Sequence, residues 1–137
     1  MLVDNLKGII FDLDNTLVKI SDDYLYDVVK NTLNEIGYRG EINREQSILF
    51  WRSIDKNNYI IKTWNVDNDT FWKSFRKYDN VDGRISNTKI FDDVYLLRKL
   101  NNKIGIFTES IKDIALAEID FPTPTLPSTW PSCSATA

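Results

Sequence analysis

The sequence has 137 residues, 42% hydrophobic and 27% charged, with a formal net charge of −3. This length and composition fit one folded domain, or one domain with a subdomain inserted in it. The lack of histidine and the single Cys133 exclude histidine catalysis, a disulfide framework and structural zinc. Any catalysis must therefore use carboxylates, hydroxyls, lysine or a hard metal bound by oxygen.

The 20 acidic and 17 basic residues are spread along the chain without long blocks of like charge. This pattern predicts neither a nucleic-acid partner nor a membrane partner. No window approaches the roughly 18 apolar residues of a membrane span, and the N-terminus lacks the pattern of a secretory signal. We therefore expect a cytoplasmic protein.

A short apolar run opens the chain at residues 6–11. Residues 8–11 are apolar at every position, which predicts a parallel strand in the centre of a sheet, covered on both faces. The polar stretch Asp12-Leu13-Asp14-Asn15-Thr16 follows directly. It lies where such a strand should end.

The middle of the chain has helical periodicity. Ser21 is a candidate N-cap for a helix that ends at Gly37, and Asn43 with Gln46 resembles a capping box for a second helix. A third helix is expected to begin at Asp69, with a short helix or turn before it. Tryptophans at helical spacing in this region are expected to form core, and the Asp-Gly pair at residues 82–83 predicts a break.

The last predicted elements are a helix over residues 91–100 and a buried strand over residues 103–108. The two strands lie much farther apart in sequence than the dozen or so residues that a parallel crossover needs. We therefore expect an incomplete α/β core made of residues 1–17 and 86–120, with a helical subdomain inserted over residues 18–85.

The composition changes abruptly after Asp120. All four prolines fall within residues 121–137, which contain no charged residue. Because proline cannot continue a helix or join a central strand, we expect these residues to be disordered or unrelated to the preceding domain.

Two carboxylates dominate the end of the first strand. Asp12 and Asp14 are two positions apart, so on an extended chain both can face one small volume and attract Mg²⁺. Such a pair permits phosphoryl transfer through an aspartyl-phosphate, with Thr16 and Thr108 as hydroxyl donors to the phosphoryl oxygens. The alternative is an ordinary acidic turn between a strand and a helix.

Two motifs resemble the haloacid dehalogenase-like (HAD) superfamily. The stretch "IIFDLDNTLV" resembles its first motif, and "KIGIFTES" resembles its second, an apolar strand that ends in Thr or Ser. Residues 6–120 as a whole resemble members with a helical cap inserted between these two motifs. The resemblance implies a HAD-like Rossmannoid sheet with an inserted cap.

The resemblance also implies roles for individual residues. Asp12 corresponds to the nucleophile and a Mg²⁺ ligand, and Asp14 to the general acid and base, with its backbone carbonyl on the metal. Thr108 corresponds to the hydroxyl that orients the phosphoryl group. Glu109 occupies a position where Asn is common, and it completes the phosphate-binding set with Thr16 and Thr108.

The later motifs of the family, a lysine or arginine and then an acidic pair, have no counterpart after Asp120, so the chain resembles a member truncated after its second motif. The expected function is that of a Mg²⁺-dependent phosphatase acting on a small phosphorylated metabolite. The rival hypothesis is a catalytically silent fragment with weak phosphate or metal binding, able to self-associate through unpaired strand edges. A third is a helical interaction module over residues 21–78.

Overall fold

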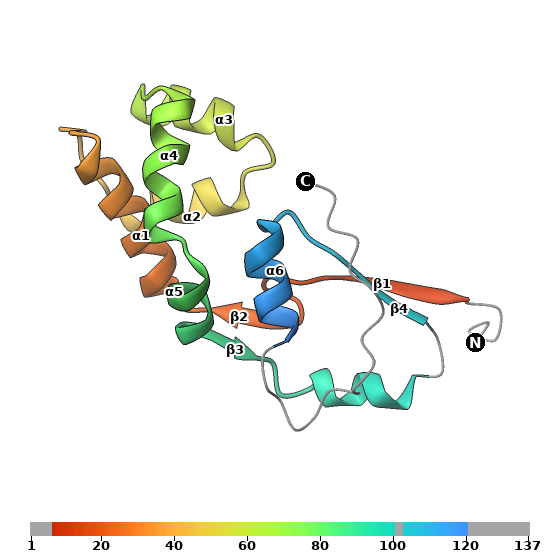
Figure 1. The fold of residues 1–137 in the computed structure, drawn as a ribbon. Helices are drawn as coiled ribbons and strands as arrows, with labels where there is room; N and C mark the ends of the chain where they lie inside the picture. The colour runs from red at the N-terminus through yellow and green to blue at the C-terminus, as the bar shows by residue number, and fades with distance from the viewer. Residues whose placement is uncertain (1–6, 101–102, 121–137) are drawn as a thin grey trace. The chain divides into compact units, whose positions relative to one another are not determined.

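The computed structural model describes residues 7–100 and 103–120 (Figure 1). The described residues divide into two compact units, one made of residues 7–20, 85–100 and 103–120 and the other of residues 21–84. The elements follow in the order β1 (Gly8–Asp12), β2 (Val18–Ile20), α1 (Asp22–Glu35), α2 (Arg44–Arg52), α3 (Lys56–Tyr59), η1 (Ile60–Trp64), α4 (Asn68–Tyr78), α5 (Val81–Ser86), β3 (Thr88–Ile90), η2 (Val94–Lys99), β4 (Lys103–Phe107) and α6 (Lys112–Ile119).

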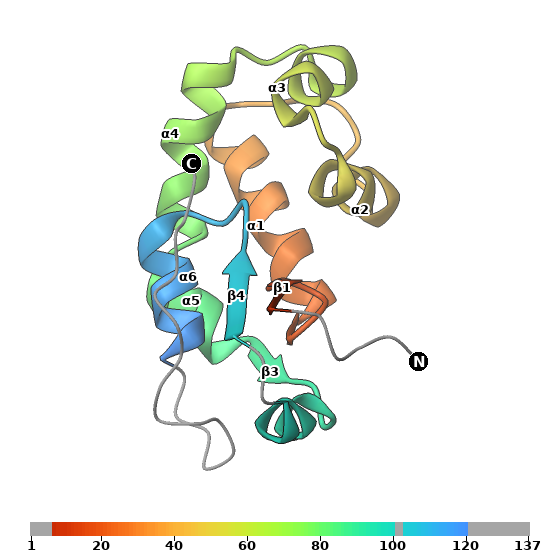
Figure 2. The same ribbon diagram turned by 90° about the vertical axis from the view of Figure 1, so that its right-hand side faces the viewer.

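The first unit contains two pairs of strands. β1 and β4 are parallel, with Asp12 in register with Phe107, and Figures 1 and 2 show them side by side. β2 and β3 form a separate antiparallel pair, with Val18 opposite Ile90. The predicted α/β class with an incomplete parallel sheet is confirmed.

One face of the β1–β4 sheet is covered by two helices. Val94 of η2 and Ala115 of α6 are buried against Ile106 of β4. The buried members of this cluster are Leu13, Leu17, Val18, Val94, Ile106 and Ala115. Burial of this apolar surface, worth about 25 cal/mol per Å², holds the two strands and the two helices together.

The other face of the same sheet is open to solvent in the part of the chain that the structure describes. Ile10 is 76% exposed and Phe107 is 53% exposed. Alternation along a strand places Ile10 on the same face as Asp12, whose register partner is Phe107. The expectation that residues 8–11 are covered on both faces is therefore wrong for the described residues.

Three other local predictions differ from the structure. Residues 18–20, assigned to the helical segment, form β2, because Val18 and Ile20 are buried while Lys19 between them is exposed, which is the period of a strand. The expected break at residues 82–83 lies inside α5, whose first turn is capped by the Asn80 side chain accepting from the Gly83 N–H at 2.8 Å. The helix expected over residues 91–100 is the 3-10 helix η2.

Side-chain caps define the helices of the second unit. The Ser21 hydroxyl caps α1, and the Asn43 side chain accepts from the Gln46 N–H at 2.9 Å at the start of α2, as predicted. The cap of α4 is Asp67 rather than Asp69: its carboxylate accepts from the Thr70 N–H at 3.0 Å. The chain leaves the π-helix η1 two residues before this cap, at Asn65, whose φ is 52°.

The core of the helical unit is aromatic. Phe50 is fully buried and lies within 5.5 to 6.2 Å, centroid to centroid, of six other aromatic rings, those of Trp51, Tyr59, Trp64, Phe71, Trp72 and Phe75. Trp64 is 3% exposed, and Trp51 and Trp72 are half-buried against the same cluster. The indole N–H of Trp51 donates to the Leu25 carbonyl at 3.0 Å, so burial leaves this polar atom satisfied.

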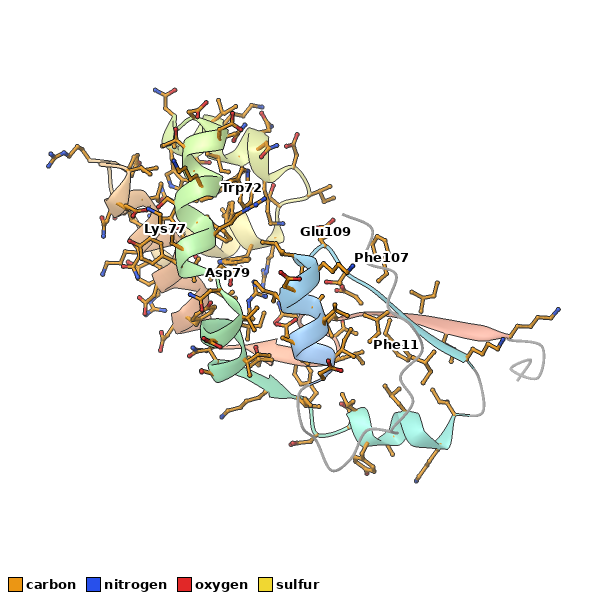
Figure 3. All side chains as sticks on the ribbon, in the orientation of Figure 1. Phe11, Trp72, Lys77, Asp79, Phe107 and Glu109 are labelled. Atoms are coloured by element: carbon orange, nitrogen blue, oxygen red, sulfur yellow. The ribbon has the colours of Figure 1, made fainter. Side chains whose placement is uncertain are left out.

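Asp79, labelled in Figure 3, follows the end of α4 and forms a buried ion pair with Arg84. The side chains of Asp79 and Arg84 are each 4% exposed, and Arg84 donates to both Asp79 oxygens, from Nε at 3.0 Å and from Nη2 at 2.6 Å. The Tyr24 hydroxyl donates to Asp79 Oδ1 at 3.1 Å, and the Arg84 guanidinium lies over the Trp51 ring at 5.6 Å. This bidentate, hydrogen-bonded geometry compensates the cost of burying two charges.

Burial, together with the Asp79 carboxylate, raises the pKa of the Tyr24 phenol. Because the folded state holds this proton more tightly, the stabilisation is complete below the unfolded pKa of about 10 and is lost as the pH rises above it. We expect the urea midpoint of the helical unit, followed by tryptophan fluorescence, to fall above about pH 10. Tyr24→Phe should lower the midpoint at neutral pH and flatten this alkaline decline, and an unchanged decline would contradict the assignment.

Candidate active site

The candidate site lies at the carboxyl end of the β1–β4 sheet. β1 ends at Asp12 and β4 ends at its register partner Phe107, so Leu13 and Thr108 follow at the same edge. Figure 3 shows Phe107 and Glu109 at this end of β4. Open parallel sheets carry their active sites at this edge, because the loops that leave adjacent strands meet there.

A tight turn follows β1. The Leu13 carbonyl accepts from three N–H groups, those of Thr16, Leu17 and Val18, at 3.3, 3.0 and 3.2 Å. The Asn15 N–H donates back to the Val18 carbonyl at 2.7 Å, and Asn15 has φ 60°, a left-handed conformation that Asn tolerates better than most residues. Leu13 is 2% exposed and anchors the turn in the core, with the exposed Asp12 on one side of it and the half-buried Asp14 on the other.

Asp12 presents an exposed carboxylate at the end of its strand. One of its oxygens accepts from the Leu13 N–H at 2.9 Å, and the other lies 3.5 Å from the Thr16 hydroxyl, which donates to it. The carboxylate is thus oriented by its own turn while it remains accessible to an incoming group.

Asp14 is held by a different partner. The Ser110 hydroxyl donates to Asp14 Oδ2 across 96 positions of sequence. Ser110 is in turn fixed by its backbone N–H, which donates to the Thr108 hydroxyl oxygen at 3.1 Å. The loop after β1 and the segment before α6 are therefore tied together through these side chains.

The two residues after β4 differ in burial. Thr108 is 2% exposed, whereas Glu109 is exposed. The structure therefore brings Asp12, Asp14, Thr16 and Thr108 to one edge of one unit, with Glu109 beside them. Ser110 was missed by the sequence analysis, although its place two residues after a strand-ending Thr and just before a helix was a usable signal.

The carboxylates of Asp12 and Asp14 and the hydroxyls of Thr16, Thr108 and Ser110 offer oxygen ligands at this edge. Among the residues that the structure describes, no group of three or more Asp, Glu or Cys side chains could hold a metal ion. Mg²⁺, however, binds through one or two carboxylates and keeps several waters, so Asp12 and Asp14 fit this cation better than they fit zinc or calcium. Over the described ranges, no helix is long and apolar enough to cross a membrane.

Comparison with known proteins agrees with this architecture. A family model described as haloacid dehalogenase-like hydrolase matches residues 9–121. The chain belongs to this family of hydrolases, which confirms the resemblance found in its two motifs. No curated protein matched the sequence significantly.

Solved structures show the same fold. A protein described as a haloacid dehalogenase-like hydrolase from Bacteroides fragilis has a TM-score of 0.70 at 20% identity, covering 94% of this chain and 62% of its own. A predicted phosphatase from Clostridium acetobutylicum has a TM-score of 0.64 at 18% identity, with 84% and 56% covered. A HAD family hydrolase from Deinococcus radiodurans, solved with bound phosphate and sodium, has a TM-score of 0.50 at 16% identity, with 85% and 52% covered. The chain thus spans 62% or less of the length of these proteins.

Proposed function

We propose that this chain carries the nucleophile-bearing part of a Mg²⁺-dependent phosphatase that acts on a small phosphorylated metabolite through an aspartyl-phosphate. The observation that carries the proposal is the exposed Asp12 carboxylate at the end of β1, with Asp14, Thr16 and Thr108 at the same edge. Membership of the hydrolase family supports it, as does the phosphate bound in the related hydrolase from Deinococcus radiodurans.

The proposed reaction has two steps. An oxygen of Asp12 attacks the phosphorus of the ester, and Asp14 gives its proton to the leaving alcohol as the P–O bond breaks. Asp14, now a carboxylate, then takes a proton from the water that attacks the phosphoryl group on Asp12, and inorganic phosphate leaves. The Asp12 carboxylate and the protonated Asp14 are restored, so atoms and charges balance over the cycle.

The hydroxyls and backbone of the edge would bind the phosphoryl oxygens. Thr16 presents an exposed hydroxyl, and Thr108 has a hydroxyl that accepts from Ser110 and keeps its own proton to donate. Glu109 contributes through its backbone N–H, because its carboxylate would repel a phosphate. Such donors stabilise the negative charge that develops on the phosphoryl oxygens in the transition state.

The cation would be held by the Asp12 carboxylate and the backbone carbonyl of Asp14. When bound, Mg²⁺ would supply positive charge that screens the Asp12 carboxylate from the phosphate that it must approach. The first unit would bind the phosphate, and the helical unit (residues 21–84) would act as a cap that excludes water and selects the substrate.

A second candidate function is supported by the exposed face of the β1–β4 sheet. Ile10 and Phe107 leave an apolar face exposed, and the chain spans 62% or less of its structural relatives. A catalytically silent protein that binds phosphate or metal weakly, and self-associates through its strand edges, would have these properties. Sedimentation analysis distinguishes the two, because this candidate predicts concentration-dependent association together with absent turnover.

The phosphatase proposal is tested with p-nitrophenyl phosphate and the purified full chain. We expect phosphate release that requires Mg²⁺, is lost on treatment with EDTA and returns when Mg²⁺ is restored. Ca²⁺, which prefers six to eight oxygen ligands at longer distances, should support less turnover. Phosphate release that continues in EDTA would contradict the metal requirement. Absence of phosphate release under all conditions would favour the catalytically silent protein.

A further inference from the structure

We propose that Ser110 is a positioning residue for Asp14. The Ser110 hydroxyl donates to the Asp14 carboxyl group and holds this side chain in the orientation from which Asp14 transfers its proton. The inference rests on the proposed function for its catalytic meaning. The contact itself, between Ser110 Oγ and Asp14 Oδ2, is independent of that function.

The two ends of this hydrogen bond are both anchored. Ser110 lies between β4 and α6, and its N–H is fixed to the buried hydroxyl of Thr108. Asp14 belongs to the turn after β1, and its backbone is held by a bridge to Val18 and by the neighbouring Asn15 N–H, which donates to the Val18 carbonyl. A hydrogen bond between two anchored segments restricts the carboxylate far more than one formed within a flexible loop.

Proton transfer explains why such restriction matters. A carboxylate two residues beyond the strand end can rotate about both side-chain torsions, and most of the resulting orientations place its oxygens away from the leaving group. A positioned acid or base contributes about 10²–10⁴-fold to a rate only when it lies within hydrogen-bonding reach of the reacting oxygen. Ser110 gives up no proton in the cycle, so its contribution is to geometry.

The consequence depends on the leaving group. An alkyl alkoxide is a strong base and needs protonation as it leaves, whereas p-nitrophenolate is stable without it. Loss of a positioning contact should therefore slow the hydrolysis of an alkyl phosphate much more than that of p-nitrophenyl phosphate. A merely structural role for Ser110 would slow both esters equally.

The experiment compares Ser110→Ala with Ser110→Thr in the full chain with Mg²⁺, using β-glycerol phosphate and p-nitrophenyl phosphate. We expect Ser110→Ala to lower kcat by about tenfold or more on the alkyl ester and by less than about threefold on the aryl ester. Ser110→Thr, which keeps the hydroxyl, should restore the alkyl rate. Ser86→Ala, at the exposed end of α5, is the matched control and should change neither rate.

A second measurement needs no turnover. The carbon-13 resonance of the Asp14 carboxyl group at neutral pH should move in Ser110→Ala, remain close to the wild-type position in Ser110→Thr, and stay unchanged in Ser86→Ala. An unmoved resonance in Ser110→Ala overturns the inference, as does an equal loss of rate on both esters. A wild-type chain that hydrolyses neither ester overturns the proposed function, while the carboxyl resonance still decides whether Ser110 holds Asp14.

Discussion

Asp12→Asn should abolish the release of phosphate. We expect kcat to fall by roughly a thousandfold or more, which is the size of loss expected when an enzyme loses its nucleophile. The amide is nearly isosteric with the carboxylate and can still accept from the Leu13 N–H, so the turn is expected to survive. The amide oxygen is a far weaker nucleophile and cannot form an acyl phosphate that water cleaves. The loss is therefore chemical rather than structural.

The measurement is phosphate release together with mass spectrometry of the acid-quenched protein, which should detect a phosphoryl group on Asp12 in the wild type alone. Asp92→Asn is the matched control, because it makes the same change of charge at an exposed position of the same unit. Turnover that persists in Asp12→Asn would place the nucleophile elsewhere. Circular dichroism of both variants verifies that the helices are retained.

Arg84→Ala should destabilise the helical unit by about 3–5 kcal/mol, the range for breaking one side of a buried ion pair. The substitution leaves the 4%-exposed Asp79 carboxylate with the Tyr24 hydroxyl but without its bidentate cation, and it removes the guanidinium from the Trp51 ring. Urea unfolding followed by tryptophan fluorescence reports this change, because Trp51, one of the fluorophores, lies beneath the arginine.

Two further variants test whether burial of the Asp79–Arg84 ion pair causes the large loss of stability. Arg44→Ala removes the ion pair between Arg44 and Asp23. This pair has a similar distance of 2.8 Å, but its side chains are 58% and 78% exposed. The substitution should therefore lower the free energy of unfolding by less than about 1 kcal/mol. Combining Asp79→Asn with Arg84→Met removes both buried charges and should be less destabilising than the sum of the two single changes. Equal losses in Arg84→Ala and Arg44→Ala would contradict the argument.

Local patterns determined most of the secondary structure. The caps at Ser21 and Asn43 were predictable because Ser and Asn satisfy orphan N–H groups within three residues of themselves. The start of α4 was misplaced by two residues because Asp67 and Asp69 are equally good caps in sequence, and only the turn at Asn65 selects the first. β2 and β3 are three residues each, too short for periodicity to distinguish them from the helices that flank them.

The sequence by itself determined the fold class and the family, and it predicted the pair Asp12 and Asp14, because an apolar run that ends in acidic residues is a signal contained within a few positions. Only the tertiary structure decided that one face of β1 is open and that Ser110 reaches Asp14 across 96 positions. Likewise, only folding brings Tyr24 to the Asp79–Arg84 pair. Exposure and contacts between distant residues depend on how separate segments pack, and no local periodicity records that packing.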